Sequence, residues 1–446
     1  MRVSCNWALG LILIGLLCGS MSAAALNAPH TLHRAKAAEP HLTESHRSVG
    51  HRATAHVGDS DARRTTARAS ATHTTAKAGS ARQLAHFTAR GQSRVGARRV
   101  ALTSRRHHSY ERFTANSFAT TDIFAGDVTA GEDPVVRQAA IDAMAGMNGT
   151  AVVIDPSNGR ILAMVNQKLA LSPGAEPCST IKITVAMAAL SEGLVTRDTM
   201  VKLDGFRMNM TQALAKSNNL YFEEMGRELG FERVRHYANQ FGLGELAGYN
   251  IEGEQLGIYP DTELPASEGG VGRMCSFGQG VSLTPLQLGA YVAALANGGT
   301  LYYLQHPTTP ADALAFQPKV KRTLNIAQYV PDIEDGMAGA VEYGTARRLR
   351  SSFQQLPVFG KTGTCSNDGT RLGWFASFSD SPQGSLVTVF LLEGGRATFG
   401  PRAAELTGAF YKNLWDRNYF ADKGLQQSAA LTPAPASEPS TQQAAQ

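Results

Sequence analysis

Strand signals in this sequence fall into two regions separated by a long helix-rich stretch, and this order restricts the fold more than any other feature. Apolar runs at 150–155 and 160–165 flank the turn residues Asn158-Gly159, a pattern typical of a β-hairpin. A closing amphipathic helix is expected over 402–415. A strand meander is expected just before it, over 358–364, 373–379 and 386–392. Both strand regions can share one sheet, so we expect an α+β fold with a central antiparallel sheet flanked by helices.

Helical patterns occupy most of the chain between the two strand regions. A stretch rich in Gly and Pro at 242–285 interrupts them and is expected to be a loop. The expected helices are 183–190 (ended by Gly193), 209–230 with a break at 217–219, 231–241, 286–296 opened by Thr284-Pro285, and 328–350.

The segment that precedes the first of these helices carries a chemical signal. Pro177 sets a turn, and Ser179 then stands where a helix would begin. A spacing of three places Ser179 and Lys182 on one face of the first turn, where a hydroxyl and an amine form a candidate nucleophile and base. The helix dipole at this end opposes the charged form of Lys182. On its own the pattern is weak, and a Ser that caps a helix beside a solvated Lys is the favoured interpretation.

Two later segments add to this signal. Ser217-Asn218-Asn219 interrupts a helical pattern, so these side chains are expected to project from a bend. Lys361-Thr362-Gly363 lies in an expected strand, which places Lys361 and Gly363 on the same side, and the glycine lets another group approach the backbone. Taken singly, the first segment reads as a loop cap and the second as an ordinary strand.

Charge and histidine are unevenly distributed. Only two of the 12 histidines, His236 and His306, lie outside 30–108, and neither has a site-like context, which argues against a Ser-His-Asp triad. The excess of basic residues lies in 27–116, a segment with few apolar or aromatic residues that we expect to be disordered. This segment either contacts an anionic wall polymer or lipid or serves as a solvated spacer.

The N-terminus has the features of a secretory signal: Arg2, an apolar core over 7–18 and small residues before a cleavage site after Ala25. An uncleaved, short membrane anchor is the alternative. We expect four parts: a signal peptide or anchor (1–25), a disordered basic linker (26–120), a catalytic domain (121–424) and a disordered tail (425–446).

The three segments, in the order S-x-x-K, S-x-N, K-T-G, resemble the penicillin-binding transpeptidase domain. The resemblance extends over about 148–416 and includes the opening hairpin, the segment 213–219, the stretch from Phe277 to Gly299, and Gly373-Trp374-Phe375 after the K-T-G strand. It implies an all-helical subdomain beside the sheet. It also implies a location in the periplasm or on the extracytoplasmic face of the membrane.

The resemblance implies a role for each site residue. Ser179 would attack the carbonyl of a D-Ala-D-Ala stem peptide of peptidoglycan, and a neutral Lys182 would take its proton, with burial and nearby cations such as Lys361 lowering the lysine pKa. Ser217 would pass a proton to the leaving D-alanine. Asn219 would hold Lys182 and a substrate amide.

The K-T-G strand would bind the substrate. Lys361 and Thr362 would bind its carboxylate, with Gly363 allowing close approach. The N–H groups of Ser179 and Thr364 would form the oxyanion hole. β-Lactams would be covalent inhibitors, and no cofactor, metal or nucleic acid is expected.

Four functions are compatible with these residues, three of them enzymatic. The leading expectation is a D,D-transpeptidase, which Thr364 after the K-T-G favours. A D,D-carboxypeptidase or endopeptidase is the first alternative, because it differs only in passing the acyl group to water. A serine β-lactamase needs a further carboxylate, for which Glu252 and Glu254 are candidates in a Gly-rich loop. A non-enzymatic β-lactam sensor is the last alternative.

Two cysteines flank the expected oxyanion donors. Cys178 replaces the glycine that is usual before the nucleophile in the resembled family, and Cys365 follows Thr364. They are either within disulfide reach across the site or two small buried thiols. With the leader removed, Cys275 is the third cysteine, and one thiol is left unpaired.

Overall fold

The computed structural model describes residues 113–382 and 384–423, which lie in the second of two units into which the chain divides (Ala101–Gln446). The expectations for the signal peptide or anchor (1–25), for most of the basic linker (26–120) and for the tail (425–446) lie outside the described residues. Within them, no helix is both long and apolar enough to cross a bilayer.

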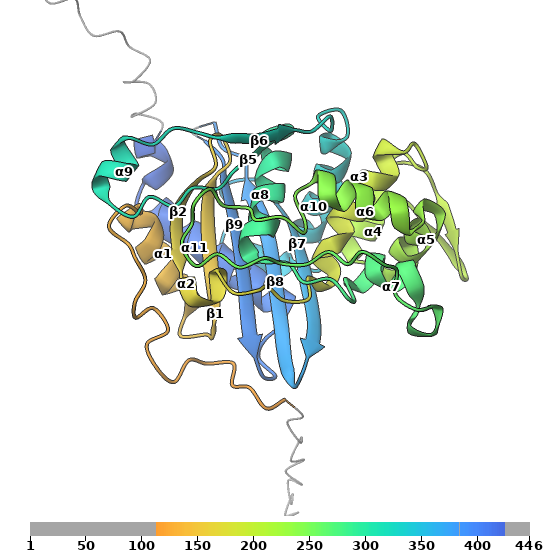
Figure 1. Cartoon of the computed structure of the whole chain (residues 1–446), viewed down its shortest axis with the longest axis horizontal. Coiled ribbons are helices and arrows are strands. Elements are labelled where there is room, and N and C mark those ends of the chain that lie inside the picture. The colour runs from red at the N-terminus through yellow and green to blue at the C-terminus, as the bar shows by residue number, and fades with distance from the viewer. Residues whose placement is uncertain (1–112, 383, 424–446) are drawn as a thin grey trace, which may run out of the picture. The chain divides into compact units, whose positions relative to one another are not determined.

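A five-stranded antiparallel sheet joins the two strand regions, as expected (Figure 1). Its strand order is β2-β1-β9-β8-β7, so the N-terminal hairpin docks on the last strand of the meander, with Ala151 opposite Phe390. This order leaves β7 at one edge of the sheet. The strands are β1 (Gly149–Asp155), β2 (Arg160–Val165), β7 (Val358–Asn367), β8 (Thr370–Ser379) and β9 (Leu386–Gly394).

Each face of the sheet is buried against helices because successive side chains of a strand point to opposite faces. On one face, Val153 and Phe390 pack with α1 (Pro134–Met144) and α11 (Gly400–Asp416). On the other face, Val152 and Val389 pack with α8 (Pro285–Ala296). The sequence explains where α8 begins: Pro285 occupies its first position, and the Thr284 and Gln287 side chains form a capping box.

The helical part of the domain lies beyond the β7 edge of the sheet (Figure 1). It contains α3 (Lys182–Ser191), α4 (Met210–Lys216), α5 (Asn219–Leu229), α6 (Phe231–Gln240) and α7 (Gly270–Phe277). Helix α10 (Val330–Glu342) packs against both α4 and β7 and so joins this part to the sheet. The α+β expectation, with its helical subdomain, is confirmed.

The expectation that 242–285 is loop was wrong in part, because α7 and a short 3-10 helix, η2 (Ala266–Glu268), lie within it. Glycine has low helix propensity, so the sequence around Gly270 and Gly272 does not predict α7. Packing stabilises this helix instead: Cys275 of α7 lies against α5 at Gly226, where an added Cβ would be 2.7 Å from its sulfur. Tertiary contact thus overrides local preference.

The expected helix over 328–350 is also two elements, α10 and the 3-10 helix η3 (Arg347–Ser351), separated by a turn that contains Gly344. The short elements that the sequence did not suggest are α2 (Gln167–Ala170), η1 (Cys178–Ile181), β3 (Val201–Leu203), β4 (Phe206–Met208), β5 (Thr300–Tyr302), α9 (Pro310–Leu314) and β6 (Val320–Thr323).

Candidate active site

The segment around Ser179 is a tight turn that leads into α3. Cys178, with φ +51°, is the first residue of the 3-10 helix η1, and α3 starts only at Lys182. Ser179 and Lys182 are therefore separated by a 3-10 turn rather than by a turn of α-helix. Both the backbone N–H and the hydroxyl of Thr180 donate to the Pro177 carbonyl, at 3.1 and 2.7 Å. Ser179 is half-buried, whereas Cys178 and Thr180 on either side are buried. The turn therefore leaves Ser179 more exposed to solvent than the residues on either side of it.

Ser217 and Asn219 come from the bend between α4 and α5. Ser217 ends α4 with φ +54°, and the Asn218 side chain caps α5 by accepting the Tyr221 N–H. A left-handed backbone is costly for a residue other than glycine, and such conformations cluster at functional sites. The expected break at 217–219 is confirmed, and its two outer side chains turn toward α3.

Lys182 is the residue around which the site side chains meet. Its Nζ donates to Ser179 Oγ at 2.6 Å and to Asn219 Oδ1 at 2.8 Å, and lies 3.4 Å from Ser217 Oγ. From the sheet edge, Lys361 Nζ donates to the same Ser217 Oγ at 2.8 Å and to the Thr362 carbonyl at 3.0 Å. Residues from three separate segments thus form one continuous set of contacts.

Both amines are fully buried, at 0% exposure. Burial lowers the pKa of Lys182 to about 7, against a smaller opposing effect of the Glu223 carboxylate. The rings of Phe222 and Phe277 lie 5.8 and 5.9 Å from its Nζ and supply apolar walls. Burial, and then the charge of Lys182, hold the pKa of Lys361 well below its usual range. Since both amines contact one hydroxyl, they titrate as a coupled pair in which a second charge is strongly opposed.

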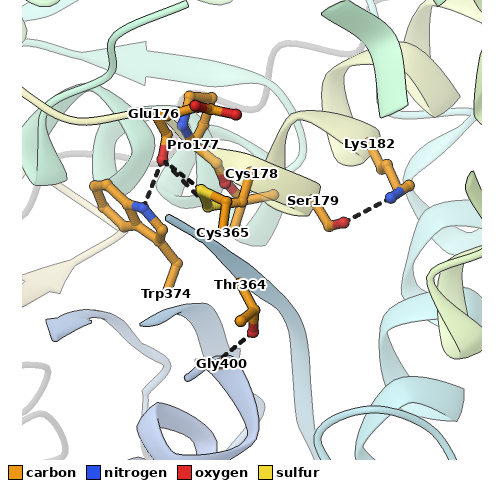
Figure 2. Close-up of a disulfide and its surroundings, with 10 residues drawn as sticks. Glu176, Pro177, Cys178, Ser179, Lys182, Thr364, Cys365, Trp374 and Gly400 are labelled. Carbon is orange, nitrogen blue, oxygen red and sulfur yellow. Dashed lines mark hydrogen bonds between the residues drawn. A yellow bond between two sulfur atoms is a disulfide. The ribbon is translucent and has the colours of Figure 1, made fainter. Parts of the chain in front are cut away.

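The remaining residues of the K-T-G strand have different neighbours. Thr362 Oγ1 donates to Thr345 Oγ1 at 2.7 Å. At Gly363, an added Cβ would lie 2.8 Å from the Pro177 carbonyl oxygen, so the glycine lets η1 sit against β7. The Thr364 hydroxyl accepts the Gly400 N–H at the start of α11 at 2.8 Å, so this side chain points toward that helix (Figure 2).

Thr345 is a site residue that the sequence reasoning missed. It lies in the turn after α10, and its N–H donates to the Ala215 carbonyl of α4 at 3.2 Å. Its neighbour Gly344 has no room for a side chain, because a Cβ there would lie 2.1 Å from the same carbonyl oxygen. Thr345 therefore bridges the S-x-N bend and the K-T-G strand. Gly344, a poor helix former inside the expected helix 328–350, was the signal that a turn stood here.

Cys178 and Cys365 form a disulfide, with Cα atoms 5.6 Å apart, which decides between the two alternatives drawn from the sequence. Figure 2 shows it between the Trp374 indole and the Ser179 turn. Trp374 Nε1 donates to the Glu176 carbonyl oxygen at 2.9 Å, and that oxygen lies 3.4 Å from Cys178 Sγ. Within the described ranges, Cys275 is the free cysteine, and it is buried.

Of the two carboxylates considered as a β-lactamase base, Glu252 is exposed and Glu254 is used within its own loop. Glu254 accepts the N–H groups of Ala247 and Gly248, at 2.9 and 3.0 Å, so it caps its own loop. Between residues 113 and 423, Gln383 aside, no group of His, Cys, Asp and Glu side chains could hold a metal ion.

Comparison with known proteins identifies similar sequences and folds. A family model of the penicillin binding protein transpeptidase domain matches residues 149–412. The chain is 29% identical to stage V sporulation protein D of Bacillus subtilis over 58% of this chain and 47% of that protein. It is 25% identical to the peptidoglycan D,D-transpeptidase MrdA of Acinetobacter baumannii, over 59% of this chain and 50% of that protein. It thus spans about half the length of these two relatives.

A solved structure with the same fold is that of Pseudomonas aeruginosa PBP2 in complex with WCK 5153. The TM-score is 0.54 at 23% identity, and the match covers 65% of this chain and 78% of that one. The D,D-transpeptidase domain of a peptidoglycan glycosyltransferase from Eggerthella lenta is similar at a TM-score of 0.51 and 19% identity, over 64% of this chain and 82% of that one.

Proposed function

This chain belongs to the penicillin-binding protein transpeptidase family, and we propose that it is a serine D,D-transpeptidase that cross-links peptidoglycan stem peptides through an acyl-serine intermediate. The observation that carries the proposal is the 2.6 Å contact between Ser179 Oγ and the fully buried Lys182 Nζ. With a pKa of about 7, an appreciable fraction of this lysine is neutral at neutral pH and can accept the serine proton.

Acylation would proceed in two proton transfers. Lys182 takes the Ser179 proton while Ser179 Oγ attacks the carbonyl of the penultimate D-alanine, and the backbone N–H groups of Ser179 and Thr364 receive the developing oxyanion. The proton then passes through Ser217 to the amine of the terminal D-alanine as the peptide bond breaks. Asn219 holds Lys182 in position, consistent with its 2.8 Å contact. A stem-peptide amine from a second strand attacks the acyl-serine and completes the cross-link.

The substrate carboxylate would bind at the sheet edge. Two side chains of the K-T-G strand would be its donors: Lys361 Nζ, which contacts Ser217 Oγ, and the Thr362 hydroxyl, whose partner is Thr345. An arriving carboxylate favours the protonated form of Lys361, and this charge in turn favours a neutral Lys182. Substrate binding would therefore prepare the base for its role.

The test is covalent labelling with a fluorescent penicillin. We expect the wild-type chain to be labelled and Ser179→Ala not to be, while Ser191→Ala, which removes a serine outside the site, labels normally. Absence of label on the folded wild-type chain would refute the proposal.

A second assay separates the activities that share the acyl-enzyme. On a stem pentapeptide, a transpeptidase joins the acyl group to an added amine acceptor, whereas a carboxypeptidase yields only the hydrolysed peptide. Fast turnover of a chromogenic cephalosporin would indicate a β-lactamase, which the position of Glu254 argues against. Labelling without any turnover of peptide would favour a sensor.

The site of action follows from the substrate. Peptidoglycan lies outside the cytoplasmic membrane, so the proposal places the domain in the periplasm or on the extracytoplasmic face. The oxidised Cys178–Cys365 pair is in keeping with such a compartment.

A further inference from the structure

The disulfide joins the two elements that the proposed reaction must hold together. Cys178 opens η1 and Cys365 lies in β7, and the two are 187 positions apart in sequence. The residue after Cys178 is Ser179, and the residue before Cys365 is Thr364. Each cysteine is thus one peptide bond from a backbone N–H that the proposed function assigns to the oxyanion hole.

The backbone at Cys178 is unusual for a cysteine. Its φ of +51° lies in the left-handed region, where glycine is favoured because it has no Cβ. Local preference therefore does not explain a cysteine here. What the side chain gains is burial, at 1% exposure, and the bond to Cys365.

Residues on both sides of the nucleophile contact the sheet. Before Ser179, the Glu176 carbonyl accepts the Trp374 indole N–H, and Pro177 sits against Gly363. After it, the Thr180 side chain lies 3.2 Å from where a Cβ on Gly363 would stand. The disulfide is the only covalent link that the described residues provide between η1 and β7. Because β7 is an edge strand, no further strand braces its outer side.

We propose that Cys178 and Cys365 are positioning residues for acylation: their disulfide holds the N–H groups of Ser179 and Thr364 at the spacing that the oxyanion requires. This inference rests on the proposed function. Displacement of a reacting group by about 1 Å can cost about 100-fold in rate, so a small relaxation of η1 from β7 is enough to matter. We expect binding of the carboxylate to change less, because Lys361 and Thr362 have their own partners in Ser217 and Thr345.

Reduction provides a direct way to remove the cross-link. Cys365 is half-buried and Cys178 is buried, so a thiolate of dithiothreitol attacks Cys365 Sγ. The S–S bond breaks, and Cys178 leaves as a thiolate that takes up a proton. The second thiol of dithiothreitol then displaces Cys365 as a thiol. The reductant ends as a cyclic disulfide, and the protein gains two protons and two electrons.

The experiment measures acylation of the full chain by a fluorescent penicillin over a range of concentrations, which separates the binding constant Ks from the acylation rate constant k2. Oxidised and reduced wild type are compared with Cys365→Ser, at a temperature where circular dichroism shows each to be folded. Cys275→Ser is the matched control, because it removes a buried thiol that takes no part in the disulfide. We expect k2 to fall at least about tenfold on reduction and in Cys365→Ser, with Ks within about twofold. The control should keep the wild-type k2 and should still lose it on reduction.

Two results would overturn the inference. One is an equal k2 for oxidised and reduced wild type, which would leave the disulfide a stabilising role alone. The other is full k2 in the double variant Cys178→Gly, Cys365→Ser, because a glycine suits φ +51° and the loss on reduction would then reflect backbone strain. If the oxidised wild type is not labelled at all, the proposed function itself fails, and this inference fails with it.

Discussion

At the scale of single residues, the site depends on two buried amines that share one hydroxyl. Lys182 and Lys361 both contact Ser217 Oγ, and neither contacts a carboxylate directly in the described part of the chain. Burying an amine without a counter-charge favours its neutral form. The Phe222 and Phe277 rings near Lys182 Nζ contribute to this burial.

The pH dependence of acylation follows from Lys182. If its neutral form is the base, k2/Ks for a penicillin rises with pH through about 7 and then levels off, because the folded-state pKa is about 7. The same shift affects stability. The unfolded chain keeps this proton up to about pH 10, so the contribution of Lys182 to the free energy of unfolding increases between about pH 7 and 10. Stopped-flow acylation from pH 5 to 9 checks the first statement, and a profile without a rise near 7 would contradict it.

Ser217 allows stability and activity to be separated. Because its φ is +54°, we expect Ser217→Gly to be more stable than Ser217→Ala by about 1 kcal/mol. Both variants remove the hydroxyl that Lys182 and Lys361 contact, so both should acylate far more slowly than wild type. Urea unfolding and penicillin labelling measure the two effects. Equal stability of the two variants would show that the backbone at this bend is not strained.

At the scale of elements, glycines allow the backbones of the elements that carry the site to pack directly against one another. Gly363 lets η1 lie on β7, and Gly344 lets the turn after α10 lie on α4. Helix α7 lies on α5 through Gly226 in the same way. These close approaches position the residues of the candidate site by contact between elements rather than by long side chains.

A pair of glycines tests the packing of α7 on α5. Gly226→Ala would bring a Cβ within 2.7 Å of Cys275 Sγ, so we expect a loss of about 1–3 kcal/mol in the free energy of unfolding. Gly272 of α7 is the matched control: its nearest contact would be 3.4 Å, and its φ is not positive. Gly272→Ala should therefore be neutral or stabilising, by up to about 1 kcal/mol. Chemical denaturation measures both, and a harmless Gly226→Ala would refute the tight contact.

At the scale of the whole molecule, one cross-link encloses most of the helical part. The disulfide closes a loop with a sequence separation of 187. For a loop of this length, the chain-entropy model predicts a stabilisation of about 5 kcal/mol. We expect the urea midpoint of reduced wild type, or of Cys365→Ser, to shift to lower urea, with a steeper slope because the unfolded chain without the cross-link exposes more surface. An unchanged midpoint would show that the unfolded chain is not constrained by the bond.

Local patterns predicted the fold where the cause of the structure is local. The Asn158-Gly159 turn, the Thr284-Pro285 start of α8 and the break at Ser217 all carry their own signals. From the three motifs, Ser179, Lys182, Ser217, Asn219 and Lys361 do lie in contact, whereas the Thr364 side chain contacts α11. Contacts between distant segments carried no such signal: α7 depends on its packing against α5, and Thr345 acquires its place only when β7 and α4 come together.

The strand order has a consequence for how the chain is made. β9 pairs with β1 on one side and β8 on the other, so the N-terminal hairpin has no neighbour in the sheet until the last strand exists. On the ribosome, that hairpin emerges long before residues 386–394 do. Nascent chains that stop short of β9 therefore lack the strand that unites the two halves. Assembly of the five-stranded sheet must therefore wait until β9 has been made.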